Sequence, residues 1–144
     1  MLKEKRCLLV EDDPDDQEFF MEVLHRVASN TGCYAVSNGE EALFTLLKED
    51  FMPDYIFTDL NMPRMGGFEF LKILRSIEKF RAIPVIVFSS DCSEENIKQA
   101  KQLGANAIYS KTRFGILPEI LRNILQIHQV IVVFSKCVDL TSTL

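Results

Sequence analysis

Four short apolar runs in this sequence each end next to polar residues that could bind a metal ion and a phosphoryl group. In order along the chain, these residues are Glu11 with Asp12, then Asp59, Ser89 and Lys111. Carboxylates held close together repel one another, and a hard divalent cation such as Mg²⁺ relieves the repulsion while keeping water and phosphate oxygens among its ligands. A lysine and a hydroxyl beside such a cation neutralise and hydrogen-bond phosphoryl oxygens. The set therefore indicates phosphoryl transfer with a carboxylate nucleophile.

The apolar runs must be strands of one sheet for these residues to meet. The runs are short and unbroken, as in parallel strands buried on both faces, and we place the strands at 7–10, 33–36, 55–59, 85–88 and 105–110. Apolar residues at helical spacing follow each run, in segments that we place at 14–27, 40–50, 67–77, 93–103 and 118–125. This alternation predicts one α/β domain with helices on both faces of a parallel sheet. Ligands bind outside the carboxyl ends of the strands in such sheets, so we expect the polar residues to share one rim.

Local signals mark the ends of two of these helices. Asp13 is placed to be the N-cap of the first helix, where Asp15 and Asp16 add negative charge that complements the helix dipole. Ser93 is placed to cap the fourth helix, and Gly104 is placed to end it. Helix capping accounts for these residues, but it leaves Glu11 and Asp12, which close the first strand, unexplained.

The order of the polar groups resembles the receiver domain of two-component response regulators over about residues 5–127. The most specific part is the segment from Asp59 to Gly67, which reads Asp-Leu-Asn-Met-Pro-Arg-Met-Gly-Gly. The resemblance implies that residues 1–127 form a receiver domain with a (βα)5 flavodoxin-like fold. It also implies a doubly wound parallel sheet of five strands in the order 2-1-3-4-5, and the strand order comes from the family and not from the residue pattern.

The resemblance also implies a role for each polar residue. Asp59 would accept a phosphoryl group from a phosphohistidine of a sensor histidine kinase or of a histidine phosphotransfer protein. Lys111 would pair with the phosphoryl oxygens, and Ser89 would hydrogen-bond one of them on activation. The implied Mg²⁺ ligands are Asp12 and Asp59 directly, Glu11 through water, and the backbone carbonyl of Asn61. The domain would modify only its own aspartate, and would signal by changing a surface that binds a downstream protein.

The sequence departs from the family pattern near its C-terminal end. Thr112 follows the lysine where receivers usually have a proline, so we expect the Lys111–Thr112 peptide bond to be trans or strained. Ile108 replaces an aromatic residue that often turns inward on activation. Residues 128–144 form a tail whose apolar start has high β-propensity. The tail could extend the last helix, add an edge strand or contact a second copy, and a homodimer could also form through helix 4, strand 5 and helix 5.

Composition narrows the possible functions. The formal net charge of −5 argues against nucleic-acid binding, because such domains usually carry a basic patch. No apolar run is long enough to span a bilayer and the first residues do not form a secretory signal, so we expect a cytoplasmic, stand-alone domain. Two alternatives remain open. One is a phosphorylation-independent pseudo-receiver that only binds partners, and the other is a flavodoxin-like cofactor-binding protein or a phosphatase with an aspartate nucleophile.

Overall fold

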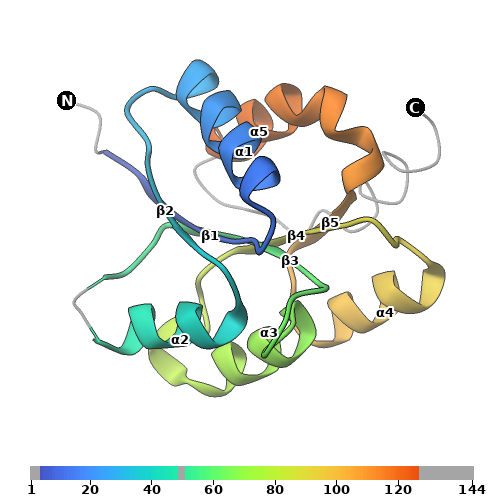
Figure 1. Cartoon of the computed structure of the whole chain (residues 1–144). Coiled ribbons are helices and arrows are strands. Elements are labelled where there is room, and N and C mark those ends of the chain that lie inside the picture. Colours follow the sequence, from blue (N-terminus) through green and yellow to red (C-terminus); the bar gives the residue numbers. More distant parts are fainter. Residues whose placement is uncertain (1–3, 49–50, 127–144) are drawn as a thin grey trace.

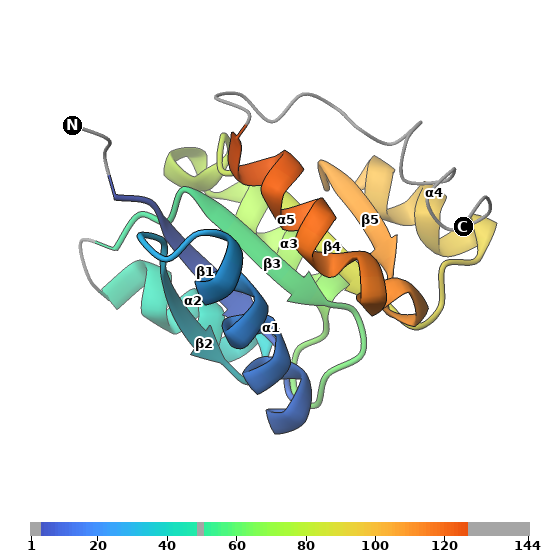
Figure 2. The ribbon, with the colours of Figure 1, turned by 90° about the horizontal axis from the view of Figure 1, so that it is seen from above.

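Five short strands form one parallel sheet in the order β2-β1-β3-β4-β5 in the computed structural model, which describes residues 4–48 and 51–126. The strands are β1 (Arg6–Val10), β2 (Gly32–Val36), β3 (Tyr55–Asp59), β4 (Val85–Ser89) and β5 (Ala107–Ser110). Figure 2 shows them side by side, with β2 and β5 at the two edges. The predicted fold class and strand order are confirmed.

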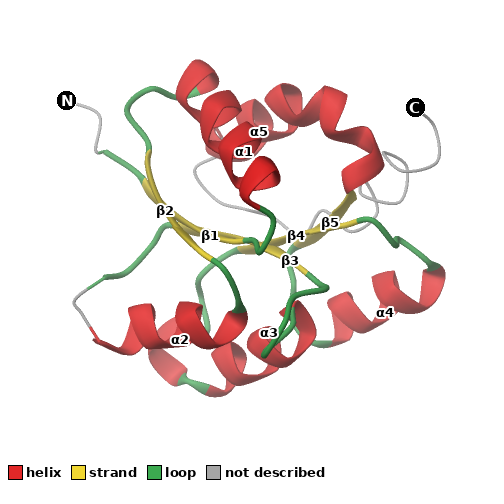
Figure 3. Ribbon diagram, viewed as in Figure 1, coloured by secondary structure: helices red, strands yellow, loops and turns green. Residues whose placement is uncertain are grey.

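Helices cover both faces of the sheet (Figures 1 and 3). The α-helices are α1 (Pro14–Val27), α2 (Gly39–Lys48), α3 (Gly67–Ser76), α4 (Glu94–Gln102) and α5 (Leu117–Gln126), and two short 3₁₀ helices are η1 (Glu78–Phe80) and η2 (Lys111–Ile116). Helices α1 and α5 pack against each other on one face, and α2, α3 and α4 cover the other. Strands β1, β3, β4 and β5 are therefore shielded from water on both sides, apart from Arg6 at the start of β1, as the sequence pattern predicts, whereas the edge strand β2 is partly exposed.

The core is built on the central strand β3 and its neighbour β4, in which every residue is buried. On the α1 face the ring of Phe57 packs against those of Phe20 and Phe88, with centroids 5.0 and 6.2 Å away. Tyr109 of β5 stacks on Phe88 at 5.8 Å. Because each fully buried aromatic side chain contributes about 2–3 kcal/mol, this row holds the strand ends that carry the polar residues in fixed positions.

Local capping follows the sequence prediction. The Asp13 side chain accepts hydrogen bonds from the backbone N–H groups of Asp15 and Asp16 at the start of α1. The Ser93 hydroxyl accepts one from Asn96 N–H at the start of α4. Gly104, directly after α4, has φ of +96°, a conformation that glycine adopts without strain.

The structure differs from the sequence prediction around β5. The strand begins at Ala107 instead of Ala105, because the Ala105 N–H donates to Ala100 O and so completes the end of α4. Lys111 opens the 3₁₀ helix η2, a segment that the sequence pattern does not predict. No peptide bond is cis in the part of the chain that the structure describes, which includes Lys111–Thr112. The predictions for the tail, residues 128–144, lie outside the described residues.

Candidate acidic site at the carboxyl rim of the sheet

The polar residues chosen from the sequence lie at the carboxyl ends of four neighbouring strands. Asp59 ends β3 and Ser89 ends β4, while Glu11 and Asp12 follow β1 and Lys111 follows β5. The order β1-β3-β4-β5 within a parallel sheet brings these ends to the same rim. The sheet register sets Asp59 opposite Phe88 and Ser89 opposite Ser110.

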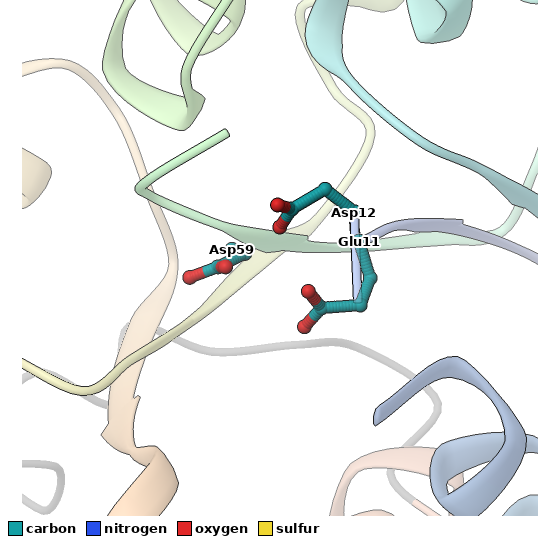
Figure 4. A group of neighbouring side chains, drawn as sticks. All are labelled: Glu11, Asp12 and Asp59. Atoms are coloured by element: carbon teal, nitrogen blue, oxygen red, sulfur yellow. The ribbon is translucent and has the colours of Figure 1, made fainter. Parts of the chain in front are cut away.

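Three carboxylates meet at this rim. Glu11, Asp12 and Asp59 each offer a carboxylate oxygen, and these oxygens all lie within 4.8 Å of one another (Figure 4). Glu11 and Asp59 are buried, whereas Asp12 is exposed and leaves the group open to water on one side. Oxygen donors at this spacing, open to solvent, fit a hard cation such as Mg²⁺, which keeps several waters when bound to protein.

Lys111 is the counter-ion of the cluster. Its Nζ atom lies 2.6 Å from Glu11 Oε1, 2.9 Å from Asp16 Oδ2 and 3.2 Å from Asp59 Oδ2. Burial disfavours the charged ammonium, but the hydrogen bonds to Glu11 and Asp16 and the charge of Asp59 outweigh this effect and raise the pKa of Lys111. The lysine therefore stays charged and shares its three N–H donors among three carboxylates.

Glu11 is the carboxylate most affected by burial. Removal from water raises the pKa of Glu11 to about 7, although hydrogen bonds from Lys111 and from the Asp13 N–H oppose this shift. Asp59 adds to the rise through like-charge repulsion. A bound cation would favour the ionised form of Glu11, because it would offset both burial and repulsion.

Asp59 is held by its own strand end and by the loop that follows it. One carboxylate oxygen accepts a hydrogen bond from Leu60 N–H at 2.7 Å, and the other faces Lys111. The Thr58 hydroxyl donates to the Asp59 backbone carbonyl. Gly67, the first residue of α3, lies so close that a Cβ atom there would be 2.2 Å from that same carbonyl. The glycine thus lets α3 begin directly against the strand end that carries Asp59.

Ser89 and Asn61, the other two predicted site residues, do not join the ionic cluster. The Ser89 hydroxyl is fully buried and bonds to its own loop, donating to Asp91 O and accepting from Asp91 N–H at 3.0 Å each. Asn61 lies two residues beyond Asp59 and is exposed. Within residues 4–48 and 51–126, neither forms a hydrogen bond with Lys111.

Asp16 is a member of the cluster that sequence reasoning missed. The sequence accounts for it as a charge in the first turn of α1, and its backbone N–H does bond to the N-cap Asp13. Its side chain, however, is two-thirds buried and forms an ion pair with Lys111, 95 residues away in the chain. The signal that sequence reasoning could have used is its place in the first turn of the helix that begins directly after Glu11 and Asp12.

A doubly wound parallel sheet with carboxylates, a hydroxyl and a lysine at its carboxyl rim defines a flavodoxin-like domain with an acidic site. Comparisons with known proteins narrow this class. The family model of the response regulator receiver domain matches residues 7–123. Chemotaxis protein CheY-3 of Vibrio cholerae serotype O1 is 31% identical over 111 residues, which cover 77% of this chain and 84% of CheY-3. The chain therefore belongs to the response regulator receiver family and is a domain of two-component signalling.

Solved structures of this family have the same fold. The phosphorylated cyanobacterial phytochrome response regulator RcpA superposes with a TM-score of 0.78 and 29% identity, over 86% of this chain and 93% of RcpA. The Mn²⁺-bound form of response regulator Rcp1 superposes with a TM-score of 0.74 and 26% identity, over 83% of this chain and 91% of Rcp1. The chain spans only 14% of the sensory/regulatory protein RpfC of Xanthomonas campestris, with 36% identity over 101 residues. None of the helices in the described part of the chain is long and apolar enough to cross a membrane.

Proposed function

We propose that this chain is a receiver that accepts a phosphoryl group on Asp59 in the presence of Mg²⁺ and then switches a protein-binding surface. The observation that supports this most is the position of Asp59. One carboxylate oxygen lies 3.2 Å from the Lys111 ammonium, and the residue shares a cluster within 4.8 Å with Glu11 and Asp12. Membership of the family supports the same function.

The chemistry assigned to Asp59 is nucleophilic attack by its carboxylate. Transfer breaks the N–P bond of a phosphohistidine and forms an O–P bond to Asp59, giving an acyl phosphate, and later attack by water returns the carboxylate and releases phosphate. Mg²⁺ bound by Asp12, Asp59, the Asn61 carbonyl and, through water, Glu11 would neutralise charge on the transferred group. Lys111 contributes a fixed ammonium beside the same oxygens.

The switch assigned to Ser89 is an exchange of hydrogen bonds. Its hydroxyl now bonds to the Asp91 backbone in the loop between β4 and α4. A phosphoryl group on Asp59, at the end of the neighbouring strand, offers new acceptor oxygens for that hydroxyl. When the hydroxyl turns toward them it releases the loop, so the change at Asp59 reaches α4 and β5.

The partners follow from this chemistry. The phosphoryl donor is a sensor histidine kinase or a histidine phosphotransfer protein, the receptor of the signal is a downstream protein, and the place of action is the cytoplasm. A homodimer through α4, β5 and α5 is a further use of the switched face. We assign the receiver to residues 1–127 and treat residues 128–144 as a separate tail.

Incubation with acetyl phosphate tests the proposed function. We expect a Mg²⁺-dependent mass increase of one phosphoryl group that is lost on mild base treatment, as an acyl phosphate should be. Removing Mg²⁺ with a chelator should suppress the adduct. If no adduct forms with acetyl phosphate or with a competent phosphohistidine donor, the chain is instead a phosphorylation-independent pseudo-receiver.

Asn61 and Asp91 are expected to set the lifetime of the phosphoryl group. Both lie two residues beyond a strand-end site residue, Asp59 or Ser89, and both are exposed where water reaches the rim. We predict that Asn61→Ala and Asp91→Ala each change the rate of dephosphorylation by more than they change the affinity for Mg²⁺, because each side chain flanks the path of an attacking water. Decay of the labelled phosphoprotein measures the rate, and Mg²⁺ titration provides the control. Unchanged half-lives in both variants would contradict this role.

Asp16 is expected to weaken the phosphorylated state, because it competes for Lys111 and adds negative charge beside the incoming anion. We predict that Asp16→Asn raises the affinity for beryllofluoride, a phosphoryl analogue, about fivefold in the presence of Mg²⁺, the size expected for one partly exposed ion pair. The matched control is Asp15→Asn, which removes the same charge from an exposed neighbour on the same helix turn. Equal effects of the two substitutions would mean that only net charge matters.

A further inference from the structure

One edge of the sheet lacks the features that usually protect an edge strand. β2 reads Gly-Cys-Tyr-Ala-Val and so contains no charged residue and no proline. No strand pairs with its outer side within residues 4–48 and 51–126. Native proteins normally protect such an edge with lysine, proline or a bulge, or cover it with another segment. We therefore expect another segment to cover the outer edge of β2.

The backbone groups at this edge can be assigned. Gly32 N–H donates to Lys5 O, and Val36 O accepts from Glu11 N–H, so these two residues face β1. Because backbone groups alternate in direction along a strand, Tyr34 also faces β1, whereas Cys33 and Ala35 face outward. Two N–H and two C=O groups thus point away from the sheet.

A groove with both apolar and polar walls lies beside the same edge, between β2 and α2. It measures about 320 Å³ and is lined by Tyr34, Val36, Glu40, Glu41, Phe44 and Thr45. Three large apolar side chains of this region are more than half exposed, at 56% for Tyr34, 65% for Phe44 and 57% for Leu47. A strand added to β2 would place every second side chain over this groove, which is how sheet edges recognise extended peptides.

The chain itself contains an apolar segment of the right kind close by. Residues 130–134 read Val-Ile-Val-Val-Phe and lie outside the described structure. Helix α5 ends beside the first residues of β1 and β3, because Leu125 O accepts from Lys5 Nζ at 2.8 Å and Ile124 O accepts from Tyr55 Oη at 3.3 Å. Two strand spacings, roughly 10 Å, separate β1 from a new position beyond β2. Four residues of extended chain span up to roughly 14 Å.

The handedness of the connection also selects this edge. The chain passes from β1 through α1 to β2, and α5 lies on the same face of the sheet as α1. A parallel strand added beyond β2 would follow α5 in the same direction across the sheet, and so would have the same hand as β1–α1–β2. A parallel strand added beyond β5 would have the opposite hand. Crossovers of one hand account for about 98% of known cases.

We propose that residues 130–134 of this chain add as a sixth parallel strand to the outer edge of β2 and cover the groove formed by Tyr34 and Phe44. The added strand pairs with the outward groups of Cys33 and Ala35. It lies at the opposite side of the sheet from the α4–β5–α5 face, so the switched surface stays accessible. The proposal does not depend on phosphorylation and can fail without affecting the function proposed for Asp59.

Amide hydrogen exchange of the full chain, followed residue by residue by NMR, tests the added strand. We expect the Cys33 and Ala35 amides to exchange at least about tenfold more slowly in the native chain than in Val132→Pro, which removes a pairing donor from the segment. Val138→Pro, the same substitution outside the apolar run, should match the native chain. The Tyr34 amide, which faces β1, should be unchanged throughout and so reports that the sheet is intact.

Two results would overturn the proposal. In the first, the Cys33 and Ala35 amides exchange equally fast in the native chain and in Val132→Pro. In the second, their protection rises with protein concentration, which would show that a second copy covers the edge. Phe44→Ser supplies an independent variant, since loss of the groove wall should speed exchange at the same two amides and leave Tyr34 unaffected.

Discussion

Replacing Asp59 with asparagine is expected to abolish the Mg²⁺-dependent phosphoryl adduct completely. The amide has nearly the shape of the carboxylate, but it carries no negative charge and is a poor nucleophile. The substitution also removes one of the three carboxylates whose oxygens lie within 4.8 Å of one another at the rim. Intact-mass spectrometry after incubation with acetyl phosphate measures the result directly, as the fraction of chain that gains one phosphoryl group.

Unfolding of the variant would be a trivial reason for the loss, and the local charges argue against it. Glu11, Asp16 and Asp59 share the ammonium of Lys111, and Asp12 lies beside Glu11 and Asp59, so removing one carboxylate relieves repulsion. We therefore expect the midpoint of thermal unfolding to stay the same or rise in Asp59→Asn. Asp54→Asn is the matched control, because Asp54 precedes the same strand at its other end and its carboxylate accepts from Arg6 N–H. An adduct that persists in Asp59→Asn would assign the phosphoryl group to another residue.

Gly67→Ala is expected to have the largest effect on stability among substitutions near the site. The new Cβ would stand 2.2 Å from Asp59 O and 3.0 Å from Leu60 Cα, both of them backbone atoms that cannot rotate away. Helix α3 or the end of β3 must therefore move. We expect the free energy of unfolding to fall by about 3 kcal/mol, the upper range for overpacked sites. Urea denaturation measures this change.

The same substitution should also reduce phosphorylation, because the shift acts on the residue that carries the nucleophile. Gly32→Ala is the matched control, since a Cβ there meets no atom within 4 Å. We expect that control to stay within about 0.5 kcal/mol of the native chain and to be phosphorylated normally. If Gly67→Ala behaves like Gly32→Ala, the close approach of α3 to Asp59 does not constrain the site.

Much of the fold could be predicted because its signals are local. The unbroken apolar runs mark strands buried on both faces, and their alternation with helical spacing requires a parallel sheet. Asp13, Ser93 and Gly104 act on backbone groups within a few residues, so their capping roles need no tertiary information. Once the sheet is parallel, Glu11, Asp12, Asp59 and Lys111 must share a rim, whichever helices cover it.

The tertiary structure decided what depends on contacts between distant segments. The pairing of Asp16 with Lys111 requires α1 to present one particular side toward the end of β5, and the packing of α1 against α5 sets that rotation. The start of β5 was set by α4, which uses the Ala105 N–H for its own last turn. The sequence by itself determined which strand-end residues gather at the rim, because strand direction alone collects them. Only the packed structure decided how the single ammonium of Lys111 is shared among Glu11, Asp16 and Asp59, because this depends on distances of a few ångströms between side chains.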